Sequence, residues 1–392
     1  MALLMAITAI LLMTVLVTEI AHGAVVRVQL AAQRRDDVKA EALAYSGVAF
    51  HRLILISSKA IGRNPMFQQF GAMLGGGNAQ ELWQALPFVD TRMMRLLFVT
   101  DGSTDEEDLE TAKEDGLSQE QIDESREEVS SLKKNFLDFD GDFRSEIQDE
   151  ERRVNIGKLQ ATNMGDLLMQ PGALELMSML SSEETNDFLN ERNLVKEELV
   201  GNLVDWQDAD DMRLYQGGSE DSLYVHLPDP YKPKNAPFDT RDEIRLVDGW
   251  HLDGLWERVG RHLTIYGSGK VNVNTALEPV LKGLLMAYYD GYATDITVQD
   301  TVDDIIRLRG APLDEGGLYF NSGEHFFNAV TNGEYEIHPL PLKPDIKSVV
   351  TSTSNVFRIS SVGEVGDARC EIHVVFDFSN DPTGRVIFWK IR

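Results

Sequence analysis

The chain has 392 residues, of which 43% are hydrophobic, and this suffices for two or three domains with real cores. Its formal net charge of −27 argues against a nucleic-acid-binding protein, because a phosphate backbone would be repelled. The single cysteine, Cys370, excludes a disulfide within the chain and is expected in the core.

The N-terminal segment predicts one long helix that starts in a membrane. Residues 1–18 contain no charge, no Gly and no Pro, and a run of this length is just sufficient to cross the hydrocarbon core. Helix-compatible residues continue to about Lys59, and the first proline is Pro65. We therefore expect residues 1–60 to form a stem helix that leaves the bilayer and continues into water.

The second half of this stem is predicted to be amphipathic. One face is defined by residues at spacings of three and four: Val28, Ala31, Arg35, Val38, Ala42, Tyr45, Ala49, Leu53 and Ile56. The other carries Arg34, Asp36, Asp37, Lys39 and Glu41. The first face is expected to pack on a globular head. The alternative is a single-pass anchor followed by an unrelated helix.

Residues 61–154 form the expected first part of the head, with an acidic insertion at 101–128. That insertion contains 13 acidic and 2 basic residues, so we expect a solvated segment. A second acidic cluster resembles a calcium loop, but its glycine stands at the wrong position for an EF-hand, which favours a solvated turn. The cluster consists of Asp138, Asp140, Gly141, Asp142, Glu146 and Asp149. A short strand is expected at 153–156.

Residues 155–340 are predicted to be a helical domain. Apolar residues recur at helical spacing between Leu159 and Val204, whereas the Pro-rich segment 226–239 must be irregular. Further helices are expected at Glu243–Val247, Gly254–Leu263, Ala276–Asp290 and Val302–Leu308. A phosphate-binding loop at 267–270 is excluded, because Val271 follows Lys270 where such a loop needs Ser or Thr.

The C-terminal residues 341–392 change to β-branched and aromatic runs. Strands are expected at Val349–Val350, Val356–Ile359, Cys370–Phe378 and Arg385–Ile391, with a hairpin loop at 379–384. The predicted fold class is therefore α+β: a long N-terminal helix packed on a C-terminal antiparallel sheet, with a large inserted helical domain.

Several motifs, taken in order and spacing, are similar to those of one known family. They are Asp205-Trp206-Gln207-Asp208-Ala209-Asp210, Gly218-Ser219-Glu220-Asp221-Ser222-Leu223-Tyr224, Val271-Asn272-Val273-Asn274-Thr275-Ala276, the N-terminal Met1–Met5 and the final Val386–Lys390. The chain resembles the minor pseudopilin K family of type II secretion systems, and the resemblance covers nearly the whole chain. In the third motif, we expect Asn274 or Thr275 to cap the following helix.

The resemblance implies a pilin-like α/β head interrupted by an inserted domain with two SAM-like, helix-hairpin-helix-like halves. It implies a non-enzymatic subunit at the tip of a short pseudopilus, where it helps to initiate assembly and protein export. The implied partners are the I- and J-type minor pseudopilins, the major pseudopilin and the secretin or cargo. The implied location is the inner membrane, crossed once, with a periplasmic head. Arg27, Arg34 and Arg35 follow the span, and the positive-inside rule would hold that flank in the cytoplasm. The rule thus opposes a periplasmic head.

Two site predictions follow from the resemblance. If Met1 is the first residue of the processed helix, Met5 stands where most pilin-like subunits carry Glu, and its lack of a carboxylate fits a cap. The family also has calcium sites near the Asp-Trp motif, and packed carboxylates need a cation between them. The expected calcium ligands are Asp208, Asp210, Glu220 and Asp221, and Trp206 is expected in the core. The alternative is that Asp205 caps a helix and the other carboxylates are solvated.

Two other functional classes remain open at this stage. One is a minor pilin or adhesin of a type IV pilus. The other is a membrane-anchored hydrolase that uses pairs of its 64 acidic residues. A zinc enzyme is unsupported, because the eight histidines show no HExxH spacing.

Overall fold

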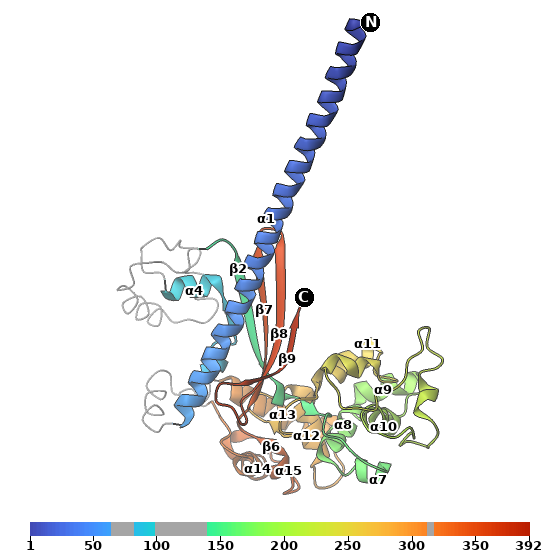
Figure 1. The fold of residues 1–392 in the computed structure, drawn as a ribbon. Coiled ribbons are helices and arrows are strands. Elements are labelled where there is room, and N and C mark those ends of the chain that lie inside the picture. Colours follow the sequence, from blue (N-terminus) through green and yellow to red (C-terminus); the bar gives the residue numbers. More distant parts are fainter. Residues whose placement is uncertain (64–81, 99–138, 312–316) are drawn as a thin grey trace.

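The computed structural model describes residues 1–63, 82–98, 139–311 and 317–392, so the acidic insertion 101–128 and Asp138 lie outside the described residues. A long rod carries a sheet along its C-terminal half, and a helical insert lies beyond the end of the sheet that is remote from the N-terminus (Figure 1). Helix, sheet and insert thus have the α+β arrangement that the sequence predicts.

The rod is a single helix, α1 (Ala2–Arg63), about 90 Å long at the usual rise per residue. Its first half is exposed among the described residues: Leu3, Leu11 and Ile20 are each more than 60% exposed. Its second half is buried on the sheet from Ala40 onward. The uninterrupted stem helix is confirmed, and it is long and apolar enough to cross a membrane.

The face of α1 that contacts the sheet is not the one that the apolar spacing predicts. Val38, Tyr45 and Leu53 are 57–66% exposed. The buried row is instead Ala40, Leu43, Ala44, Gly47, Val48, His51 and Leu55. The reason is steric, because small residues let the helix backbone lie directly on the strands. The larger apolar side chains are left on the outer face.

Two glycines mark this close approach. A Cβ on Gly363 would lie 2.0 Å from the carbonyl oxygen of Ala40 and 2.6 Å from the backbone nitrogen of Ala44. A Cβ on Gly47 would lie 2.4 Å from Oγ of Ser361. Neither strand nor helix can therefore carry a side chain at these points.

The sheet has five strands in the order β1-β2-β7-β8-β9, and all neighbours are antiparallel. The strands are β1 (Phe88–Asp90), β2 (Asp142–Asp149), β7 (Val356–Val365), β8 (Ala368–Asp377) and β9 (Arg385–Ile391). The last three are the expected C-terminal strands, and Cys370 is buried in β8. Short helices α3 (Leu82–Ala85) and α4 (Thr91–Phe98) flank β1.

Strand β2 corrects the solvated turn expected over the second acidic cluster. Its alternate residues Phe143, Ser145, Ile147 and Asp149 are buried, but two of these four are polar, which hides the alternation in the sequence. Ser145 is accommodated by a 2.7 Å hydrogen bond with Nδ1 of His51. Asp140, before the strand, forms an exposed ion pair with Lys39 at 2.9 Å.

The insert leaves the sheet after β2 and returns at β7, two strands that are direct neighbours. Its core runs from Val154 to Val350, past the expected boundary at residue 340. Its helices are α7 (Met164–Leu167), α8 (Pro171–Leu180), α9 (Glu183–Glu191), α10 (Lys196–Asp205), α11 (Asp253–Arg258), α12 (Glu278–Ala287), α13 (Asp295–Gly310), α14 (Gly323–Asn332) and α15 (Ile346–Val349). Short 3-10 helices are η2 (Glu150–Arg152), η3 (Glu220–Leu223), η4 (Arg241–Leu246), η5 (Gly260–His262) and η7 (Glu334–Glu336).

The insert contains two similar halves that pack against each other. Each half pairs two short parallel strands: β3 (Val154–Asn155) with β4 (Leu263–Thr264), and β5 (Val271–Asn272) with β6 (Val350–Thr351). A helix with Pro in its first turn follows β3 and β5, namely α8 and α12. These two helices cross at Gly283, where a Cβ would lie 2.4 Å from Cγ of Met179. The expected C-terminal strand at Val349–Val350 thus belongs to the insert and not to the main sheet.

Three consecutive acidic residues join the insert to the sheet. Asp149 accepts hydrogen bonds from Asn272, Thr275 and Ser354, at 3.1, 2.5 and 2.5 Å. Burial raises the pKa of Asp149 to about 6, against the effect of the bonds from Ser354 and Thr275. Thr275 therefore binds Asp149 instead of capping the next helix, whose N-cap is Leu277.

The next two acidic residues complete the junction. Glu150 is fully buried and accepts from Thr264 at 2.6 Å and from Arg358 at 2.5 Å, with Arg153 at 3.3 Å. Burial alone would raise the pKa of Glu150, but the charges of Arg153 and Arg358 hold it at about 2. Glu151 accepts from both the backbone and the hydroxyl of Ser268, which gives the Gly-Ser-Gly-Lys turn a structural role.

Candidate metal centre

Helix α10 delivers the first carboxylate of the candidate centre. Its residues from Leu199 onward are buried, so Asp205 at its C-terminal end is carried into the core. Trp206 follows, only 4% exposed, with its ring edge-on to Tyr224 and Tyr231. This aromatic packing confirms Trp206 as a core residue and fixes the turn that holds Asp208.

A tight loop returns the chain to the same place. Met212 and Ser219 form an isolated antiparallel bridge, and Gly217 and Gly218 between them adopt positive φ angles of 71° and 98° that other residues rarely accept. Glu220, which follows Ser219, is the first residue of η3 and is only 1% exposed.

The three carboxylates of Asp205, Asp208 and Glu220 converge on one point. Each offers an oxygen, and these oxygens all lie within 4.8 Å of one another. Oδ1 of Asp205 accepts from the backbone of Leu214 at 2.9 Å. The remaining buried oxygens have no hydrogen-bond partner among the described residues: Oδ2 of Asp205, Oδ1 of Asp208 and both Oε atoms of Glu220.

Such a group of buried, unpartnered carboxylates is electrostatically unfavourable without a cation. Burial, followed by repulsion from neighbouring acidic residues, raises the pKa of Glu220 to about 8. Burial also raises the pKa of Asp205 to about 7 and that of Asp208 to about 6. Hard divalent cations are held by oxygen atoms, and Ca²⁺ takes six to eight of them. These residues therefore fit a calcium ion whose other ligands would be carbonyl oxygens or water.

The expected ligand set is brought together only in part. Asp208 and Glu220 belong to the cluster, but exposed Asp210 accepts from the backbone of Met212 at 2.8 Å and Asp221 pairs with Lys232 at 2.6 Å. Asp205, which is not among the expected ligands, is the third member of the cluster. A signal was available, because Asp205 continues a run of buried helical positions where an apolar residue would be usual.

The segment that carries the cluster is similar to a known protein family. Residues 154–268 match the family model described as type II secretion system (T2SS), protein K. The type II secretion system protein K of Aeromonas hydrophila is 25% identical over 245 residues, which are 60% of this chain and 67% of that protein. Over these segments the chain is similar to type II secretion system protein K. The resemblance seen in the sequence motifs is thereby confirmed, and the carboxylate cluster lies inside the matched segment.

A solved structure is also similar to this chain. It is the crystal structure of the GspK-GspI-GspJ complex from the enterotoxigenic Escherichia coli type 2 secretion system. The TM-score is 0.45 at 16% identity, over 64% of this chain and 80% of that one.

Proposed function

We propose that this chain is a minor pseudopilin at the tip of the type II secretion pseudopilus, where it acts as an assembly subunit and not as an enzyme. The observation that carries the proposal is the form of α1. Its first half is apolar and exposed, and its second half is buried on a sheet without any break between them. Such a helix can span the inner membrane and later, in the filament, pack against the stem helices of neighbouring subunits in place of lipid.

The outer face of the stem supports this use. Val38, Tyr45 and Leu53 leave an exposed apolar row on α1, in which the ring of Tyr45 also lies 6.0 Å from that of Trp389 in β9. A row at this spacing is suited to helix-helix packing, in which side chains of one helix fill the grooves of the next. The apolar surface thus continues from the membrane half into the part that carries the head.

The position of the insert supports a place at the filament end. It projects beyond the sheet and to one side of the rod, at the end remote from the N-terminus (Figure 1). A neighbour stacked beyond that end of the head would meet the insert. We infer that the I- and J-type minor pseudopilins and the major pseudopilin pack along the stem, that the head is periplasmic, and that the secretin or cargo meets the insert.

Co-purification tests the proposed partners. Tagged full-length protein, extracted in detergent from membranes that also contain the I- and J-type subunits, is expected to retain both. A Leu53→Glu variant is expected to lose most of this retention, because it places a charge in the apolar row. Asp229→Lys, on the exposed surface of the insert, is the control for a charge change elsewhere. Failure of the unaltered protein to retain either subunit contradicts the proposal.

We further propose that Asp205, Asp208 and Glu220 bind calcium and so fix the 205–224 loop. Calcium at a hundred times its dissociation constant is expected to stabilise the fold by about 2.7 kcal/mol, measured as a rise in thermal midpoint over a chelated sample. Glu220→Gln is expected to abolish this rise, because a neutral amide replaces one of the three carboxylates that would hold the cation.

Asp221→Asn is the matched control for the calcium prediction. It neutralises the adjacent carboxylate, which pairs with Lys232, and the calcium response should stay intact. Loss of the response in Asp221→Asn, with its retention in Glu220→Gln, would show that the cluster is not the site.

A further inference from the structure

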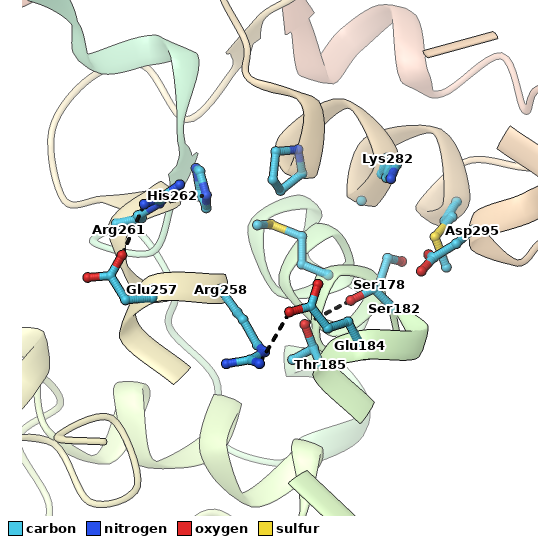
Figure 2. A pocket seen from close by; sticks show the side chains of 14 residues that line it. Ser178, Ser182, Glu184, Thr185, Glu257, Arg258, Arg261, His262, Lys282 and Asp295 are labelled. Atoms are coloured by element: carbon cyan, nitrogen blue, oxygen red, sulfur yellow. Dashed lines mark hydrogen bonds and ion pairs between the residues drawn. The ribbon is translucent and has the colours of Figure 1, made fainter. Parts of the chain in front are cut away.

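A pocket of about 430 Å³ lies between the two halves of the insert, distinct from the carboxylate cluster. One wall comes from the 257–262 segment of α11 and η5, and the opposite wall comes from α8, α9 and the start of α13 (Figure 2). Met179, Pro279 and Met286 add apolar surface. This volume is within the range of sites that bind small ligands or short peptide segments.

The 257–262 wall offers two buried donors without a partner among the described residues. One is Nε of Arg258 and the other is Nδ1 of His262. Nε2 of His262 receives the N–H of Arg261 at 3.3 Å and so acts as the acceptor, which leaves the ring proton on Nδ1. Burial and the nearby arginine charges lower the pKa of His262 to about 4, so this neutral form persists. Buried donors of this kind are costly unless something accepts from them.

The same wall also gathers positive charge on a very acidic chain. Arg258 pairs with Glu184 at 3.2 Å and Arg261 pairs with Glu257 at 3.0 Å. The side chains of both glutamates are exposed, at 79% and 63%. Exposed ion pairs contribute little free energy, so an incoming carboxylate can replace these partners at small cost.

The opposite wall offers an acceptor. Oδ1 of Asp295 is buried and has no partner among the described residues, whereas its Oδ2 accepts from the backbone of Glu183 at 2.9 Å. Donors on one wall and an acceptor on the other match a peptide, which carries backbone N–H groups beside its side chains. The apolar methionines between the walls can receive the aliphatic part of such a segment.

We propose that this pocket binds an acidic peptide segment, with its carboxylate on Arg258 and His262 and a backbone N–H on Asp295. The required partner is a polypeptide that presents Asp or Glu in an extended stretch. This site goes beyond the assembly role proposed above and does not depend on it, since nothing in its construction involves the stem or the filament.

Methyl NMR locates binding without any substitution. Full-length protein with ¹³C-methyl methionine, in detergent, is titrated with the probe acetyl-Ala-Glu-Ala-amide. The methyl signals of Met179 and Met286 are expected to shift saturably, while that of the exposed Met169 stays in place. The isosteric probe acetyl-Ala-Gln-Ala-amide is expected to bind at least tenfold more weakly. Equal shifts with both probes, or none at Met179 and Met286, would overturn the proposal.

A substitution tests the wall itself. Arg258→Gln is expected to weaken binding of the Glu probe at least tenfold. Arg245→Gln is the matched control, because Arg245 pairs with Asp253 outside the pocket and carries the same charge. If Arg258→Gln disturbs folding, Arg261→Gln, whose side chain is more exposed, replaces it with a smaller expected loss. A folded Arg258→Gln variant that binds like the unaltered protein refutes the assignment.

Discussion

Glu150→Ala is expected to destabilise the protein by about 3–5 kcal/mol, because it leaves buried cations without a counter-charge. Glu150 is fully buried between Arg153 and Arg358, whose side chains are 7% and 15% exposed. Removing the carboxylate also leaves the hydroxyl of Thr264 without its acceptor. The loss is measured as a lower denaturant midpoint of the full-length protein in detergent.

The control is Glu364→Ala, on the same sheet. Glu364 forms an ion pair with Arg369 at 3.7 Å, and both side chains are more than half exposed. Its removal is expected to cost less than about 1 kcal/mol, as for other surface pairs. A Glu150→Ala variant as stable as Glu364→Ala would show that the junction does not hold the insert on the sheet.

The pH dependence of the free energy of unfolding independently tests the role of the Glu150 carboxylate. The pKa of Glu150 is lowered from 4.5 to about 2 by folding, so its contribution is complete above pH 4.5 and disappears as the pH falls toward 2. The difference in stability between the unaltered protein and Glu150→Gln should therefore narrow over this interval. A difference that widens on acidification would contradict the ion-pair account.

Gly363→Ala is expected to cost about 3 kcal/mol, the upper part of the range for overpacking, although it adds only one methyl group. The methyl would lie 2.0 Å from the carbonyl oxygen of Ala40 and 2.6 Å from the nitrogen of Ala44. Both atoms belong to the helix backbone, which cannot rotate aside as a side chain could. The helix must then lift from β7, which exposes Ala40, Ala44 and their neighbours.

Hydrogen exchange distinguishes this mechanism from a general loss of stability. Amides of α1 from about residue 40 to 55 should exchange faster in Gly363→Ala, while the separate core of the insert, residues 154–350, keeps its protection. Gly310→Ala is the control, because a Cβ there meets no atom within 4 Å. Unchanged exchange in α1 would mean that the helix and sheet tolerate the methyl group.

The helices and strands that the sequence predicts correctly are those specified by residues close to one another in the chain. The stem is predicted because residues 1–18 are uncharged and mostly apolar and no proline follows before Pro65. Strands β8 and β9 are predicted because β-branched and aromatic residues stand on either side of the Asn380–Gly384 turn. Local periodicity and turn chemistry suffice for such elements.

What the tertiary structure decided depends on residues far apart in the chain. The apolar spacing of Val38, Tyr45 and Leu53 does not reveal that Gly363 draws the opposite, small-residue face of α1 onto the sheet. Likewise, Asp205 becomes a candidate ligand only because the Gly217-Gly218 turn returns Glu220 to the end of α10. The sequence determined which segments are helix or strand, whereas close backbone contact and the burial of unpaired charge are properties of pairs brought together by folding.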